Sequence, residues 1–366
     1  TKKAGSIIYI NLKIFPHKKV RIGVIKGGKV KKYYEVTTGL EKEIPVKDTD
    51  TYSVFVQNNR LRYEFTISRN ITIIRGDSAT GKTTLLDLLN AYDRDGDSSG
   101  VLVKCEVPCV VIGGQRWEEN LQFIHNSIVF IDECNRFIKS EDFAVRVKES
   151  DNYFVIVTRD DLPNLPYSVK EIYGIRESGK YAGLKQVYNE FYCLYGELEN
   201  TELAQESLVI AEDSNAGFDF FSSLCDGIVN CISANGKSTV FKALQEHREE
   251  KVLVIADGAA FGCEMEKVMQ LIRIGRKIAL YLPESFEWLI LNAGIFDDSE
   301  LKAILNDPSE YVDSKEFFSW ERFFTDLLVK KSHGTYLQYN KRSLNKAYLQ
   351  EKIKNKIVNT MPSIEF

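Results

Sequence analysis

The chain has no run of 18 apolar residues, so nothing in its 366 residues predicts a membrane-spanning helix. Its opening stretch TKKAGSIIYI is too short and too interrupted to predict a secretory signal peptide. Charge of one sign is not in large excess either, since a net charge of −4 gives no global field that would attract DNA or a membrane. The seven cysteines are scattered, and no second pair joins Cys105 and Cys109 to complete a zinc site. Together these absences predict a cytoplasmic protein without a membrane partner.

The composition that remains is that of an ordinary globular protein, with 44% hydrophobic and 27% charged residues. Its length predicts two or three domains, at roughly 100–200 residues each. We expect an α/β fold in four parts: antiparallel β hairpins in 1–65, alternating strands and helices in 66–198, a second α/β domain in 199–299 and a helical extension in 300–366. The polar, acidic stretch 194–207 is the expected linker between the two α/β domains.

The stretch IRGDSATGKTTLLDLLNAY, residues 74–92, has the complete phosphate-loop spacing. The apolar run Ile71–Ile74 before it predicts a buried strand, and the spaced leucines after it predict a helix. A strand, a glycine loop and a helix in this order direct backbone N–H groups and a helix N-terminus at phosphate oxygens. The residues expected to bind the nucleotide are Gly76, Asp77, Ser78, Ala79, Thr80, Gly81, Lys82, Thr83 and Thr84.

Two of these residues have predicted roles in the chemistry of the nucleotide. Lys82 would reach the β- and γ-phosphates, and Thr83 would hold Mg²⁺. Fifty residues after Lys82, the apolar run Ile128–Ile131 leads into Asp132 and Glu133, the form of a Walker B strand. Asp132 would hold Mg²⁺ through its water shell, and Glu133 would polarise the attacking water. The sequence therefore predicts a P-loop ATPase core with ATP and Mg²⁺ as cofactors, and the preference for ATP over GTP stays open.

The next strand, in VIVTRDDLPNLPY, resembles the strand of RecA-like and cassette ATPases whose tip senses the γ-phosphate. Thr158 and Arg159 occupy that place, although cassette ATPases usually have histidine where Arg159 falls. Two roles stay open for Arg159, a contact with phosphate or a structural pair with Asp160 or Asp161. Arg136 is a weaker candidate for a finger that acts on the nucleotide of a partner.

The stretch IGGQRW, residues 112–117, is similar to the signature that caps the partner's ATP in cassette ATPases. Only about 30 residues separate it from the phosphate loop, and it directly follows the strand-like run CVVI. A strand-end turn is therefore the favoured interpretation, and dimerisation around ATP has no support from this motif.

Residues 1–65 predict two hairpins, one around Gly27-Gly28 and one around Gln57-Asn58-Asn59. Cassette-type ATPases place such hairpins over the nucleotide. A small separate β module is the alternative.

A second glycine–lysine motif, Gly236-Lys237-Ser238, lacks the first glycine of a phosphate loop because Cys231 stands in its place. We therefore expect a loop that leads into a helix, without a nucleotide.

Carboxylates at the ends of apolar runs are more informative in the second domain. Glu212 and Asp213 end SLVIAED, Asp257 ends VLVIAD, and Glu284 and Glu287 follow IALYLP. The carboxyl ends of neighbouring parallel strands meet at one edge of a sheet, where α/β proteins bind ligands. Oxygen ligands gathered at such an edge suit Mg²⁺ or Mn²⁺.

This arrangement resembles the Toprim domain of topoisomerases, primases and OLD-family (overcoming lysogenization defect) nucleases, over residues 207–295. In that family a glutamate ends the first strand and assists phosphodiester chemistry, and Asp-x-Asp ends the third strand and holds metal. The resemblance places Glu212 in the glutamate position, as a catalytic and metal-binding residue, and Asp257 in the first aspartate position. PESFEWLIL is similar to the acidic segment that follows in OLD-type Toprim domains.

Two positions depart from the family pattern. Ala259 replaces the second aspartate and Asp213 replaces the usual glycine, so two-metal cleavage stays open. Either Asp213 or Glu264 supplies the missing ligand, or the domain no longer cleaves. The resemblance implies an ATPase that controls a metal-dependent nuclease acting on nucleic acid, with a role in defence against phage. The alternative is a nucleotide-dependent switch or assembly protein whose inactive second domain binds a partner.

The C-terminal stretch 330–356 carries eight Lys or Arg residues against one Glu, with Tyr336, Tyr339 and Tyr348 between them. Such a face tracks nucleic-acid phosphates in some proteins, and in others a charged helix merely contacts solvent. Nucleic acid, a protein partner and a second copy of the chain are all candidate partners.

Overall fold

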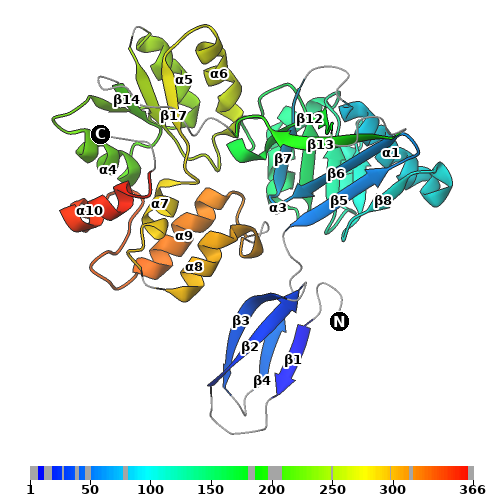
Figure 1. Cartoon of the computed structure of the whole chain (residues 1–366), viewed down its shortest axis with the longest axis horizontal. Helices are drawn as coiled ribbons and strands as arrows, with labels where there is room; N and C mark the ends of the chain where they lie inside the picture. The colour runs from blue at the N-terminus through cyan, green and yellow to red at the C-terminus, as the bar shows by residue number, and fades with distance from the viewer. Residues whose placement is uncertain are drawn as a thin grey trace.

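The computed structural model describes the side chains of residues 51–76, 81–179, 186–196, 208–248, 250–296, 298–312 and 316–361. Within residues 1–50 it describes only the backbone of four strands. Strands and helices alternate along most of the described chain, which has a mixed α/β architecture built on one large and one small sheet (Figure 1).

The first four strands form two antiparallel pairs, drawn in blue apart from the rest of the chain in Figure 1. β1 (Ile7–Asn11) pairs with β4 (Glu41–Pro45), and β2 (Lys19–Lys26) pairs with β3 (Lys29–Thr37). The β2–β3 pair is the hairpin predicted around Gly27-Gly28, two residues that themselves lie outside the described ranges.

The large sheet has the strand order β8-β5-β6-β13-β12-β7-β11-β10-β9. The strands from β12 to β9 in that order are parallel, and β7, β10 and β11 are buried at every position. Parallel strands covered on both faces need such continuous apolar runs. The bounds are β5 (Tyr52–Gln57), β6 (Leu61–Ile67), β7 (Ile71–Ile74), β8 (Leu102–Lys104), β9 (Cys109–Ile112), β10 (Ile128–Ile131), β11 (Tyr153–Val157), β12 (Ile172–Glu177) and β13 (Val187–Cys193).

The division predicted between residues 65 and 66 is wrong, because it falls inside β6. β6 pairs antiparallel with β5 and parallel with β13, which in turn pairs with β12. The second predicted hairpin is therefore part of the large sheet and not a separate module. The bridging strand β13 comes late in the chain, so local patterns gave no sign of this connection.

The helices of the large sheet begin with α1 (Lys82–Asp95), which directly follows the phosphate-loop segment. It buries the leucine face expected from the sequence and contacts β9, β5 and β8. α2 (Trp117–Leu121) and α3 (Glu141–Glu149) lie before and after β10 in the chain. Ser140 caps the N-terminus of α3, and its Oγ accepts a hydrogen bond from the N–H of Phe143 (3.2 Å).

The small sheet has the order β15-β14-β16-β17, and every pair in it is parallel. Its strands are β14 (Leu208–Ala211), β15 (Cys231–Ser233), β16 (Val252–Ile255) and β17 (Ile278–Tyr281). The helices that alternate with them are α4 (Ala216–Cys225), α5 (Lys237–Glu246), α6 (Met265–Arg273) and α7 (Phe286–Asn292). The three apolar runs that end in carboxylates are thus strands of one sheet, as the sequence predicts.

The C-terminal helices are α8 (Ser299–Asn306), α9 (Trp320–Ser332) and α10 (Glu351–Val358), drawn in orange and red beside α7 and α4 in Figure 1. Their apolar side chains belong to the same hydrophobic cluster as those of β14, β16 and α7. They are therefore built into the small-sheet part of the molecule. We call residues 51–196 the first unit and residues 208–361 the second unit.

The two units share a further hydrophobic cluster, which contains Val129 and Phe154 of the large sheet together with Ile210 and Val254 of the small sheet. The described residues include no helix with both the length and the apolar character that a bilayer crossing requires.

Candidate functional site

The phosphate-loop segment connects the buried strand β7 to α1, as predicted. Asp77, Ser78, Ala79 and Thr80 lie outside the described residues, so the loop is seen at its two ends. Gly76 has φ 131° and Gly81 has φ 90°, values that favour glycine. A Cβ at Gly81 would also lie 2.8 Å from the hydroxyl of Tyr63, which donates to the carbonyl of Gly81 (3.0 Å).

Lys82 is directed back across the loop. Its side chain is buried, and its Nζ donates to the carbonyl of Gly76 at 2.8 Å. Thr83 and Thr84 follow in the first turn of α1, Thr83 exposed and Thr84 half-buried. The ammonium group and a helix N-terminus thus lie at the ends of one loop, where both attract an anion.

The Walker B-like pair lies at the same sheet edge as this loop, because β10, β11 and β7 are neighbours and parallel. Asp132 is half-buried, and its Oδ1 accepts a hydrogen bond from the N–H of Glu133 (2.7 Å). Glu133 is exposed and forms an ion pair with Arg159 at 3.4 Å. The edge therefore brings together the carboxylates and the arginine that the sequence singled out.

Thr158 and Arg159 differ in what they contact. The Oγ1 of Thr158 is buried and accepts a hydrogen bond from the N–H of Asp160 (3.0 Å), which closes a turn. Arg159 pairs with Glu133, whereas Asp161 pairs with Arg75 at 2.7 Å. Asp160 pairs with Lys139 at 2.7 Å, so both aspartates next to Arg159 in the sequence have cationic partners elsewhere in the fold.

The IGGQRW stretch and the Gly236-Lys237-Ser238 motif are both turns, as expected, and each leads into a helix. IGGQ follows β9 directly, and the N–H of Gly114 donates to Oδ1 of Asn135 at 2.8 Å. Arg136 is exposed and begins the short 3₁₀ helix η2 (Arg136–Lys139), which directly follows Asn135. Lys237 begins α5, and its Nζ donates to the carbonyl of Ala260 at 3.1 Å.

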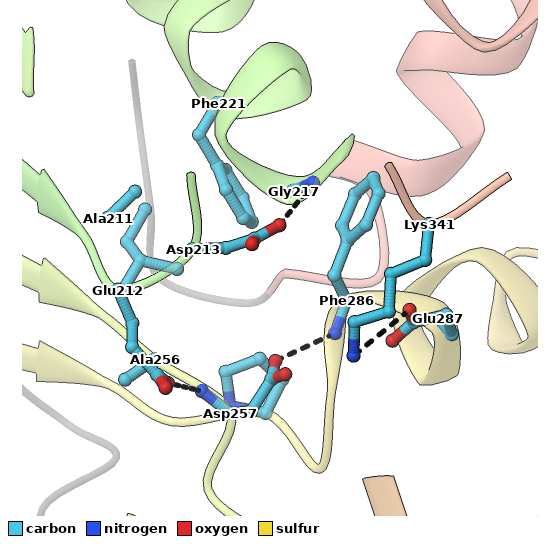
Figure 2. A pocket seen from close by; sticks show the side chains of 12 residues that line it. Ala211, Glu212, Asp213, Gly217, Phe221, Ala256, Asp257, Phe286, Glu287 and Lys341 are labelled. Carbon is cyan, nitrogen blue, oxygen red and sulfur yellow. Dashed lines mark hydrogen bonds and ion pairs between the residues drawn. The ribbon is translucent and has the colours of Figure 1, made fainter. Parts of the chain in front are cut away.

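The second candidate site is the carboxylate pocket between β14, β16 and α7 (Figure 2). Glu212 follows β14 and Asp257 follows β16, and these two strands are paired. An Oε of Glu212 accepts a hydrogen bond from the backbone N–H of Asp257 (3.0 Å), and Oδ1 of Asp257 accepts one from the N–H of Phe286 (3.0 Å). The structure therefore places the two carboxylates side by side, as the sequence predicts.

Two further residues of this site were missed or misread in the sequence. Lys341 lines the pocket, with its Nζ 2.6 Å from Glu321 and 3.9 Å from Glu287. The hydroxyl of Tyr339 donates to Oε1 of Glu287 at 2.9 Å. Lys341 and Tyr339 belong to the basic stretch that predicted a surface, and only the fold brings them to the pocket.

The interpretation of that stretch as an aromatic nucleic-acid face is therefore wrong in part. Tyr339 and Tyr348 are 4% and 0% exposed and belong to the hydrophobic core, whereas Tyr336 is 71% exposed. Buried rings cannot stack on bases.

Glu287 has an unusual environment in the pocket. Its side chain is 2% exposed, and its Oε2 has no hydrogen-bond partner among the described residues. The pocket encloses about 20 Å³, room for one water-sized or ion-sized occupant. A buried carboxylate oxygen without a partner costs free energy, so a donor or cation in this cavity would stabilise it.

The pKa shifts of the pocket residues also indicate that a cation would stabilise the pocket. Burial raises the pKa of Glu212 to about 7. Burial, together with repulsion from Glu321 and Glu212, raises the pKa of Asp257 well above its usual value. Burial opposes the charge of Lys341, but Glu287 and Glu321 outweigh it and raise the pKa of the lysine. The carboxylates are thus short of positive charge even with Lys341 present.

The other predicted carboxylates have different partners. Asp213 accepts hydrogen bonds from the N–H groups of Ser214 (2.8 Å) and Gly217 (2.9 Å), at the start of α4. Glu264 is buried and pairs with Lys267 at 2.9 Å. Glu264 is therefore not placed to replace the aspartate missing at Ala259, which is itself buried, whereas Asp213 lines the carboxylate pocket with Glu212 and Asp257.

Glu284 faces away from the pocket and connects the two units. Its carboxylate accepts two hydrogen bonds from Arg69, at 2.9 and 3.0 Å. Arg69 also lies 3.4 Å from Glu171, and its guanidinium lies 3.6 Å from the ring centre of Trp320.

The pocket does not form a metal site as its side chains lie. Within the described ranges, no three His, Cys, Asp or Glu side chains converge in a way that would hold a metal ion. One carboxylate oxygen of Glu212 and one of Asp257 already accept a hydrogen bond from a backbone N–H group.

Comparison with known proteins adds nothing to this geometry. No protein-family model, curated protein or solved structure matches the chain.

Proposed function

We propose that the chain binds and hydrolyses ATP at the phosphate loop, and that its nucleotide state controls the second unit. The observation that carries the proposal is the place of Lys82, buried and turned onto Gly76 between a strand and a helix N-terminus. The Walker B-like pair at the same sheet edge supports hydrolysis in addition to binding.

The residues present suit ATP with Mg²⁺, and each has a defined part. Lys82 would neutralise the β- and γ-phosphates, and Thr83 and Asp132 would hold Mg²⁺. The metal would neutralise charge that develops on the transferred phosphoryl group. Glu133 would orient and polarise the attacking water, and Arg159, beside it, would contact phosphate charge.

The test of this proposal is ATP binding and turnover by the purified chain and two variants. Lys82→Ala should bind ATP roughly 10- to 100-fold more weakly, the effect of losing one charge-assisted contact. Glu133→Gln should bind ATP normally but hydrolyse it roughly 100-fold more slowly or worse. Lys237→Ala is the matched control, since Lys237 also follows a glycine and begins a helix. Equal ATP affinity in Lys82→Ala and in the native chain would refute the proposal.

For the second unit, the first candidate function is a Toprim-like, metal-dependent nuclease. The adjacency of Glu212 and Asp257, the unpartnered Oε2 of Glu287 and the ion-sized cavity favour it. Nucleic acid would then be the substrate, and a role in defence against phage would follow from the resemblance to OLD-family proteins.

The second candidate is an inactive unit that binds a partner, so that the whole chain is a nucleotide-dependent switch. The buried Ala259 in the place of an aspartate and the lack of three converging ligands among the described residues favour this candidate. The partner would be another protein or a second copy of the chain.

One assay separates the two candidates. Plasmid DNA with Mn²⁺ and ATP should be nicked by the native chain and not by Glu212→Gln if the first candidate holds. Glu246→Gln, which changes an exposed glutamate of α5 outside the pocket, is the control. Nicking at equal rates in all three proteins would indicate a contaminant and exclude a Toprim-like activity.

A further inference from the structure

One chain segment contacts both candidate sites. This connecting segment, residues 158–171, starts at Thr158 after β11 and ends with the 3₁₀ helix η3 (Val169–Glu171) before β12. Its apolar side chains Leu162, Leu165, Tyr167 and Val169 are all buried in the hydrophobic cluster that the two units share.

At the phosphate loop the connecting segment is held by Arg75, which immediately precedes Gly76. Nη2 of Arg75 donates to the carbonyl of Asp160 (3.0 Å), to Oδ1 of Asp161 (2.7 Å) and to the hydroxyl of Tyr167 (3.3 Å). Arg75 is 5% exposed, so these contacts are shielded from water and stronger than on a surface. The side chain of Arg75 thus links the backbone next to Gly76 to the connecting segment. A displacement of the loop at Gly76 would therefore move the segment.

At its other end the connecting segment is bonded to the loop after β16. The N–H of Val169 donates to the carbonyl of Gly258 (2.9 Å), and the N–H of Gly262 donates to the carbonyl of Tyr167 (3.0 Å). A Cβ on Gly262 would lie 2.4 Å from the ring of Tyr167, so only glycine allows this approach. Two backbone hydrogen bonds and a close contact therefore fix the segment against the second unit.

The loop after β16 also carries Asp257, the residue directly before Gly258. The N–H of Gly258 donates to the carbonyl of Pro283 (2.6 Å), and a Cβ there would meet the carbonyl of Leu282 at 2.5 Å. Asp257 in turn holds the N–H of Phe286 at the start of α7. Because such packed contacts are nearly incompressible, a shift of Val169 would move the backbone beside Asp257 and alter the carboxylate pocket.

We propose that the connecting segment transmits the occupancy of the phosphate loop to the carboxylate pocket, with Arg75 and Tyr167 as positioning residues. The inference rests on the proposed function, since it requires a nucleotide at the loop. The nucleotide acts through contacts that differ between the free and bound loop, as any coupling between two sites requires. The inference concerns the route and does not depend on whether the second unit cleaves nucleic acid.

The test is hydrogen exchange of the full chain in Mg²⁺, with and without a non-hydrolysable ATP analogue. The informative amides are those of Asp257, Gly258, Gly262 and Phe286, which report the loop after β16 and the pocket. Bound nucleotide should change their exchange rates by roughly fivefold or more, the lower range of usual coupling between sites.

Gly262→Ala should bind the nucleotide with native affinity but lose this response, because the added methyl group pushes Tyr167 away. Gly196→Ala is the matched control, since a Cβ there meets Cys193 at an ordinary 3.5 Å, and it should respond like the native chain. Tyr167→Phe, which loses only the hydroxyl that Arg75 contacts, should show a reduced response and decides the question if Gly262→Ala does not fold.

The outcomes are distinct. Nucleotide binding without any change at these amides overturns the route and leaves the proposed ATPase intact. A full response in both Gly262→Ala and Tyr167→Phe overturns it as well. Absence of nucleotide binding by the native chain overturns the proposed function and the route together.

Discussion

Removal of the Arg69 side chain is expected to weaken the molecule at the contact between its two units. Arg69 donates two hydrogen bonds to Glu284, lies 3.4 Å from Glu171 and stacks on Trp320. The side chains of all three charged residues are less than 10% exposed. In Arg69→Met, Glu284 keeps the half-exposed Lys170, whose Nζ lies 3.4 Å away.

The expected loss in Arg69→Met is about 3–5 kcal/mol, the usual result of leaving a buried charge without its partner. That is a large part of an ordinary domain's stability of roughly 5–15 kcal/mol. Glu284→Gln should cost less, because Arg69 retains Glu171. The double variant Arg69→Met/Glu284→Leu should recover part of the loss, since it removes both charges of this pair and leaves Glu171 with its hydrogen bonds from Ser68 and Thr72.

The difference in stability between the native chain and Arg69→Met should become smaller at acid pH. Burial alone would raise the pKa of Glu284, but Arg69 outweighs burial and holds that pKa below its usual value. A lowered carboxyl pKa gives stability that is present above the unfolded-state pKa and is lost as pH falls through the folded-state pKa. Native and Arg69→Met chains should therefore converge in stability at strongly acid pH.

Urea unfolding at pH 7, followed by the fluorescence of Trp320 in a Trp117→Phe/Trp288→Phe background, measures these effects. A loss of less than about 1 kcal/mol in Arg69→Met, the size of a surface pair, would refute the reasoning. So would a double variant in which the two single losses simply add.

Two predictions concern the carboxylate pocket. Because burial raises the pKa of Glu212 to about 7, its contribution to stability is fully present below the unfolded-state pKa and is lost as pH rises toward 7. Urea unfolding in EDTA should show a steeper loss between pH 5 and pH 8 in the native chain than in Glu212→Gln, and equal slopes would contradict this. Under the first candidate function, Mn²⁺ at a hundredfold excess over Kd should stabilise the full chain by about 2–3 kcal/mol. Thermal melting should show that rise in the native chain and not in Asp257→Ala, and a melting curve indifferent to Mn²⁺ would favour the inactive unit.

The phosphate-loop strand and helix could be predicted because their signals are local. Ile71–Ile74 is buried at every position and α1 begins at Lys82, as the apolar run and the leucine spacing indicate. The same holds for β14, β16 and β17, whose apolar runs place Glu212 and Asp257 on neighbouring strands.

Contacts between distant parts of the chain could not be predicted in this way. Lys341 reaches the carboxylate pocket only because α7, α9 and the stretch after α9 fold against the small sheet. Arg75 was passed over because nothing in the sequence marks a buried arginine that holds Asp161 and Tyr167. Glu284 and Glu287 share one segment, yet one faces Arg69 and the other faces the pocket.

The hydrophobic cluster shared by the two units has a consequence for any attempt to divide the protein. A cut within 197–207 would leave Leu165 and Tyr167 on one fragment and Phe261 and Met265 on the other, all of them fully buried in the intact chain. Each fragment alone would present an apolar surface to water and tend to aggregate. Produced together, the same fragments should reassemble, so the chain is a natural candidate for split-protein complementation.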